Sequence, residues 1–158
     1  MPEALRLLRR EIRYSEAKTE EVNILRRIQY YDQQNEFFTR LSNHGNWMKA
    51  VVVHHLGLPS PNACQVANVE DWLHGSFNVC IPVTISVDGR RKHSGTRVLL
   101  RLPLPYRTGE EFRPGNSDEK IRCEAGIYAW LQENCPDVPI PQLYGFATSD
   151  GQTVFNSF

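Results

Sequence analysis

Arg101 is the residue of this 158-residue chain whose position most strongly suggests chemistry. It lies inside the apolar run VLLRLPL at residues 98–104, which has the composition of a buried strand. Removing a guanidinium group from water is costly unless an anion neutralises its charge. We therefore expect a carboxylate from elsewhere in the chain to lie against Arg101.

A second charged residue interrupts an apolar pattern downstream, in the helix that the sequence predicts at residues 116–133. At the i, i+3, i+4 spacing of an α-helix, one stripe holds Ile121, Glu124, Ala125, Tyr128 and Leu131. Glu124 should therefore face the core, where it would form a buried ion pair with Arg101. Kinase-type phosphotransferases use such a pair, in which a helix glutamate holds the strand cation that binds the phosphates of ATP.

Two other interpretations of Arg101 stay open. Strand alternation places it on the face of Leu99, opposite Leu100 and Leu102. One face of an antiparallel sheet can be wet, so Arg101 could extend to water instead of the core. The ion pair could also be purely structural, without a ligand.

A glycine stands at the junction of two predicted strands, in the segment HGSFN at residues 74–78. Glycine allows backbone N–H groups to approach a triphosphate, so this hairpin could close over a nucleotide. The simpler interpretation is a tight turn with the glycine at positive φ. On the evidence of this segment alone, the simple turn is the favoured interpretation.

Composition narrows the class of protein. Hydrophobic residues make up 41% and charged residues 23%, which is typical of a folded globular chain, and the net charge of +0 argues against nucleic acid as a partner. No apolar stretch is long enough for a membrane span. The four cysteines form no C-x-x-C pair, which favours reduced thiols in the cytoplasm, and we expect no metal site.

The order of predicted elements indicates an α+β fold. Arg6, Arg9, Arg10 and Arg13 alternate with acids as on the solvated face of a helix. We predict helices at 15–41 and 47–56, the second ended by Gly57, and a capping-box-like start at Asn116 and Glu119 for the later helix. Strands are predicted at 66–73, 77–87, 96–102, 143–147 and 153–155, with a turn at Asp88-Gly89. Residues 1–60 would form a helical extension and residues 61–158 a second domain.

Four motifs, in this order, resemble the aminoglycoside phosphotransferase family, particularly its fungal branch. They are WLHGSFNVC at 72–80, VLLRLPLP at 98–105, RCEAGIYAWL at 122–131 and VPIPQLYG at 138–145. The resemblance covers about residues 64–153, and the upstream helix pair also looks like the N-terminal extension of that branch. It implies a protein-kinase-like small lobe, with a five-stranded antiparallel sheet and one crossing helix, preceded by the N-terminal helix pair.

The resemblance also implies roles for individual residues and a nucleotide ligand, ATP. Gly75, Ser76, Phe77 and Asn78 would form the hairpin that covers the phosphates. Arg101 would be the phosphate-contacting cation and Glu124 its helix partner. Many kinase-like enzymes carry lysine in place of Arg101, and arginine differs from lysine in its planar, bidentate geometry.

Catalysis in this family needs residues that we do not find in the chain. An aspartate that orients the acceptor hydroxyl, and an asparagine and second aspartate that hold magnesium, belong to the large lobe. The sequence contains no His-x-Asp followed by such an Asn. We therefore expect a truncated, kinase-like small lobe that is inactive alone, with an incomplete ATP site and magnesium bound only with the missing lobe. The alternatives are a non-catalytic interaction module, whose exposed lobe interface a protein partner covers, and a non-functional gene fragment.

Overall fold

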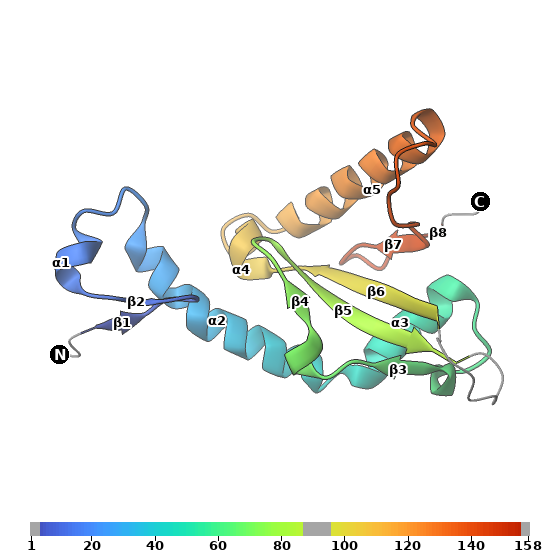
Figure 1. The fold of residues 1–158 in the computed structure, drawn as a ribbon, viewed down its shortest axis with the longest axis horizontal. Coiled ribbons are helices and arrows are strands. Elements are labelled where there is room, and N and C mark those ends of the chain that lie inside the picture. Colours follow the sequence, from blue (N-terminus) through green and yellow to red (C-terminus); the bar gives the residue numbers. More distant parts are fainter. Residues whose placement is uncertain (1–3, 87–95, 156–158) are drawn as a thin grey trace. The chain divides into compact units, whose positions relative to one another are not determined.

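A computed structural model describes residues 4–86 and 96–155, so the predicted Asp88-Gly89 turn lies outside the described residues. The chain divides into two compact units, Met1–Asn43 and His44–Phe158 (Figure 1). The predicted boundary at residue 60 lies within the second unit. None of the described helices has the length and apolarity needed to cross a membrane.

The first unit is a hairpin packed on a helix. Strands β1 (Leu5–Arg6) and β2 (Glu11–Ile12) pair antiparallel, and helices α1 (Tyr14–Ala17) and α2 (Ile24–Ser42) follow. The helix predicted for the arginine-rich start is wrong, because Leu7 and Ile12 are buried together with Ile24 of α2. The predicted continuous helix at 15–41 is also interrupted, since the Asn23 side chain accepts a hydrogen bond from the Arg26 amide and so begins α2.

The second unit begins with α3 (Gly45–Leu56), which ends where the sequence predicted. Gly57 adopts a left-handed conformation, with φ of 61°, as a helix C-terminal glycine commonly does. A 3-10 turn (Pro61–Ala63) leads into the main sheet. The strands of this sheet are β3 (Cys64–Val66), β4 (Leu73–His74), β5 (Asn78–Ile85) and β6 (Thr96–Pro103).

Strand β5 is the centre of the sheet, with β6 on one edge and both β3 and β4 on the other (Figure 1). The single strand predicted at 66–73 is therefore wrong, because a 3-10 turn (Val69–Asp71) separates β3 from β4. Pro82 explains the interruption. Its carbonyl accepts a hydrogen bond from the Ala67 amide, but proline has no N–H to return the second bond of an antiparallel pair. The Trp72 indole then donates to the Ala67 carbonyl and closes the detour at 3.0 Å.

The two faces of the sheet have different coverings. Val79, Ile81, Val83 and Ile85 of β5 point to one face and are at most 4% exposed. On that face Val83 packs with Val52 of α3. Arg101 points to the opposite face with Leu99, as strand alternation predicted, and its cross-strand neighbour there is Cys80.

Helices α4 (Pro105–Thr108) and α5 (Asn116–Asn134) follow the sheet, and a hairpin of β7 (Gly145–Ala147) and β8 (Thr153–Phe155) completes the described chain. The predicted inward stripe of α5 is confirmed, since its members are buried or half-buried between exposed residues. The unit is α+β, but the single five-stranded sheet is wrong, because β7 and β8 form a separate two-stranded sheet. Pro136, Pro139 and Pro141 precede β7 and cannot donate the amide hydrogen bonds that a longer strand beside β6 would need.

Candidate functional site

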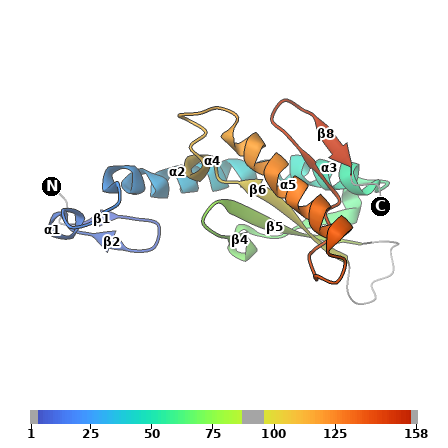
Figure 2. The same cartoon turned by 90° about the horizontal axis from the view of Figure 1, so that it is seen from above.

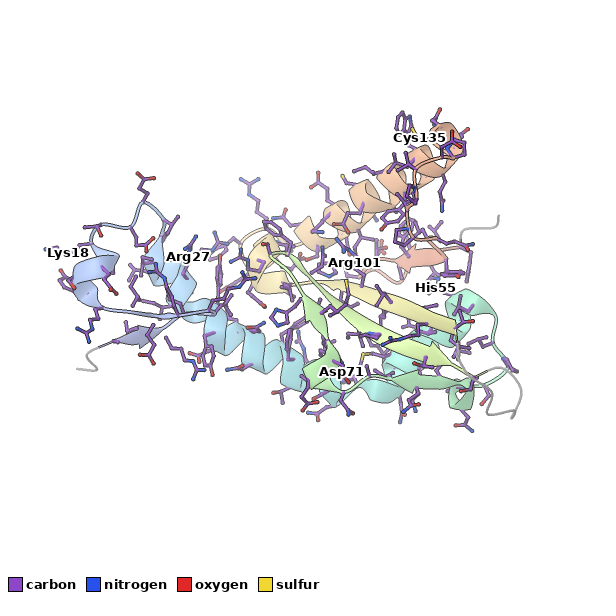
Figure 3. All side chains as sticks on the ribbon, viewed as in Figure 1. Lys18, Arg27, His55, Asp71, Arg101 and Cys135 are labelled. Atoms are coloured by element: carbon purple, nitrogen blue, oxygen red, sulfur yellow. The ribbon has the colours of Figure 1, made fainter. Side chains whose placement is uncertain are left out.

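Arg101 and Glu124 meet side by side. The Arg101 Nε lies 3.1 Å from Glu124 Oε2, and Nη2 lies 3.2 Å from Oε1, so the guanidinium donates to both carboxylate oxygens (Figure 3 labels Arg101). The predicted ion pair is confirmed. Its predicted burial is wrong, because the two side chains keep 49% and 33% of their surface exposed. The open face of β6 leaves this pair partly in water, as the alternative interpretation of Arg101 allowed.

Two further residues join the pair, and we call the four of them, Asn78, Arg101, Lys120 and Glu124, the polar cluster. The Lys120 ammonium, one helical turn before Glu124, donates to Glu124 Oε1. The same ammonium lies 3.1 Å from the Asn78 Oδ1, and the Asn78 amide nitrogen lies 3.5 Å from Glu124 Oε1. The first residue of β5 is thus connected to α5 through hydrogen bonds.

The electrostatics of the polar cluster favour its charged form. Partial burial alone would raise the pKa of Glu124, but hydrogen bonds from Arg101 and Lys120 outweigh it and lower that pKa. The hydrogen bond to Glu124 raises the pKa of Arg101. Two cations and one carboxylate leave one net positive charge. An ammonium has three donors and a guanidinium five, so both cations keep N–H groups beyond those directed at Glu124 and Asn78.

The glycine segment forms the turn that enters β5. The Gly75 amide donates to the Asn78 carbonyl at 3.0 Å, closing the turn. The simpler interpretation is therefore right about the tight turn but wrong about its backbone, because Gly75 is not at positive φ. A Cβ atom built on Gly75 would meet no atom of residues 4–86 or 96–155 within 4 Å. Neither backbone strain nor lack of space among the described residues therefore requires glycine here.

Arg107 of α4 holds this turn from outside, and sequence analysis did not identify it. Its Nε donates to the Ser76 carbonyl at 2.7 Å, and its guanidinium carbon lies 5.6 Å from the centre of the Phe77 ring. The Leu104 amide also donates to the Phe77 carbonyl at 2.8 Å. The structure thus places Ser76 and Phe77 against the segment after β6, while Asn78 belongs to the polar cluster.

The start of α5 differs from the predicted capping box. Asn116 is the first helical residue, so the N-cap residue is Gly115. Glycine has no side chain with which to cap the helix. The Glu110 carboxylate does so from the preceding loop, accepting from the Gly115 amide at 2.6 Å and the Ser117 amide at 2.7 Å. The Gly115 hydrogen bond is the main reason that the pKa of Glu110 is lowered. The spacing from Asn116 to Glu119 matched the motif, but the helix begins one residue too early to use it.

All four cysteines are thiols that form no disulfide. One of them, Cys80, lies beside the polar cluster. The Cys80 Sγ is 3.8 Å from the Arg101 Nη1. Among the residues that the structure describes, no three histidine, cysteine or acidic side chains gather as a metal site.

The polar cluster and the glycine turn form one arrangement at one end of β5. Sequence reasoning identified Asn78, Arg101 and Glu124 but missed Lys120, whose i, i+4 spacing to Glu124 was an available signal. No family model matches the chain, and no curated protein and no solved structure matches it either.

Proposed function

We propose that the second unit binds the phosphates of a nucleotide, as the small lobe of an aminoglycoside-phosphotransferase-like, kinase-like protein. One observation carries the proposal, the bidentate pair of Arg101 with Glu124. A carboxylate that fixes a half-exposed guanidinium in one orientation prepares it to contact an anion. The side chain has already lost its conformational entropy on folding, so little more is lost on binding. The paired residues come from the strand and the helix that the family resemblance assigns to this role.

The donor set fits phosphate oxygens. Arg101 and Lys120 would hold them, while Glu124 and Asn78 orient these two cations. The Gly75 turn supports the same assignment, because a side chain is missing at a position where the fold has room for one. ATP would supply the transferable phosphoryl group. As in the family, magnesium would be held by residues of the large lobe.

The test is a titration of the full chain with ATP, followed by calorimetry or by a fluorescent ATP analogue. Removing one charged hydrogen-bond partner costs about 1.5–3 kcal/mol, so Arg101→Ala should weaken binding about tenfold or more. Glu124→Ala should weaken it by less, since both cations remain but lose their orientation. Arg97→Ala is the matched control, because Arg97 is exposed on the same strand and the same face.

Two outcomes contradict the proposal. One is that the wild-type chain binds no ATP at millimolar concentration. The other is measurable binding that Arg101→Ala and Glu124→Ala leave unchanged.

A second candidate function is a non-catalytic interaction module, and it is favoured by exposed apolar side chains. Leu73 and Leu99, on the face of Arg101, are 60% and 56% exposed, and Trp130 on α5 is 57% exposed. A protein partner would cover such residues. A monomer in size-exclusion chromatography that binds no hydrophobic dye would count against this candidate. A cooperative melt in circular dichroism would count against the third alternative, a non-functional fragment.

A further inference from the structure

The imidazole of His55 is a polar group of the second unit whose surroundings fit it poorly. His55 lies in the last turn of α3 (Figure 3). Its Nδ1 is fully buried and has no hydrogen-bond partner among the residues that the structure describes. Buried polar atoms are nearly always paired, so this nitrogen requires an explanation.

The β7–β8 hairpin covers the buried nitrogen. A Cβ atom on Gly145 of β7 would overlap His55 Nδ1 and would lie 2.6 Å from the Val154 carbonyl oxygen, so only glycine fits. The Phe155 ring of β8 lies 4.9 Å from the His54 ring and 5.3 Å from the His55 ring. Figure 2 shows β8 beside α3. The open end of the hairpin is therefore packed directly on the two histidines.

The turn end of the same hairpin is attached to α5. The Ser149 amide donates to the Asp118 carboxylate at 2.9 Å, and Arg122 lies 3.8 Å from Asp150. The hairpin thus connects α5 with α3, which contact opposite faces of the sheet. Its contact with α3 includes the packing of Phe155 against the two histidine rings and the close approach of Gly145 to His55.

We propose that the β7–β8 hairpin is a pH-sensitive latch, which stays on α3 while the His55 ring is neutral and is released when that ring takes up a proton. A neutral Nδ1 can remain buried beside Gly145 at the cost of one missing hydrogen bond. A protonated Nδ1 places a charged N–H in the same position with no acceptor bonded to it, which is far more costly. Moving the hairpin away would bring water to the cation.

The neighbouring charges act in the same direction. On α3 the titratable side chains besides His55 are Lys49 and His54, and neither of them can carry the negative charge that would stabilise a protonated His55. Strands β7 and β8 contribute none, and on β6 the two arginines point to the other face of the sheet. Strand β3 contributes the thiol of Cys64, whose pKa is raised by burial, so it stays uncharged. Burial, and then His54, lower the pKa of His55 below its ordinary 6.5.

The sign of the pH effect follows from this. With the hairpin closed, His55 resists protonation, while an opened hairpin restores its ordinary affinity for the proton. The closed form is thus fully favoured above pH 6.5 and loses its advantage as the pH falls toward the lowered pKa. Across this interval the ratio of open to closed hairpin should rise about tenfold per pH unit, since one proton is taken up.

Nuclear magnetic resonance of the full chain tests the latch directly. Nuclear Overhauser effects between the Phe155 ring and the two histidine rings should be strong at pH 8 and should weaken progressively as the pH falls below 6.5. The loss should follow the titration of His55. Gly145→Ala should abolish these effects even at pH 8, because the added methyl group cannot fit beside His55.

Two variants separate His55 from its neighbour. His55→Phe should keep the Phe155–His54 contact at pH 5, while His54→Gln should lose the Phe155–His55 contact on acidification, as the wild type does. Ring contacts in the wild type that persist to pH 5 after His55 has titrated would overturn the proposal. An unchanged acid transition in His55→Phe would do the same. Neither readout involves nucleotide, so the outcome is independent of the proposed function.

Discussion

The two faces of the main sheet differ in polarity and in burial. On the face toward α3, the side chains of β5 are almost completely buried, and Val83 and Cys64 pack with Val52. On the face toward α5, Arg101, Lys120, Asn78 and Glu124 form a half-exposed network of hydrogen bonds and ion pairs. Ala125 is the one buried residue of α5.

Under the proposed function, this difference separates the face that stabilises the unit from the face that binds the nucleotide. Burial of apolar surface supplies most of the free energy of folding, so the α3 face should hold the unit together. Half-exposed ion pairs contribute little to stability. Their charges remain accessible to solvent, so the nucleotide binding proposed above would use a face that the fold does not need for its stability.

The sharpest test of this difference is Ile81→Ala. Ile81 is 0% exposed on the α3 face. Its truncation removes buried methyl groups and leaves a cavity, so the free energy of unfolding should fall by about 2–5 kcal/mol. Urea denaturation followed by circular dichroism measures this change.

Leu99→Ala is the matched control for Ile81→Ala, because Leu99 is on the adjacent strand but on the opposite face, where it is 56% exposed. Its effect on the free energy of unfolding should not exceed about 0.5 kcal/mol. Equal losses from the two substitutions would contradict the distinction between the faces.

The next effect concerns how α5 is kept in place with so little burial. Glu110 satisfies two amides at the helix start, so Glu110→Ala should destabilise the unit by about 1 kcal/mol, as the loss of other N-terminal caps does. Glu111→Ala is the control, since Glu111 is exposed in the same loop. Urea denaturation of both variants measures the difference, and an equal response would show that the carboxylate of Glu110 does not cap α5.

Local sequence patterns predicted the parts of this architecture that depend on periodicity. The inward stripe of α5, the Gly57 end of α3 and the two faces of β6 all follow from the spacing of residues along one element. The pairing of Arg101 with Glu124 was also predictable, because each residue interrupts an apolar pattern and their charges are opposite.

The features that sequence analysis missed depend on what lies across from a residue. Pro82 of β5 ends the pairing with β3 and so separates β3 from β4. Only the register of the strands shows that the missing N–H of Pro82 faces Ala67. The burial of Arg101 was overestimated because the apolar run around it does not show that α5 leaves that face partly open. The Leu7 and Ile12 hairpin was missed because charges dominate its short sequence.

The smallest effect that we expect is an acid-dependent one on the α5 face. Since the pKa of folded Glu124 is lowered, its ion pairs add stability that is fully present above the ordinary pKa of 4.5. That stability is lost as the pH falls through the lowered value. Because the cluster is partly in water, the amount should be only about 0.2–1 kcal/mol. The unfolding free energy, measured at intervals from pH 7 to pH 3, should therefore fall less steeply in Glu124→Gln than in the wild type.

Glu119→Gln separates this effect from the general change in charge, because Glu119 is an exposed acid on the same helix. It should leave the acid-side slope of the wild type in place. A loss of several kcal/mol at neutral pH in Glu124→Gln would mean that the α5 face holds the unit together as strongly as the α3 face does. The polar cluster would then be a structural element, and its cations would be too firmly engaged with Glu124 to turn toward a phosphate.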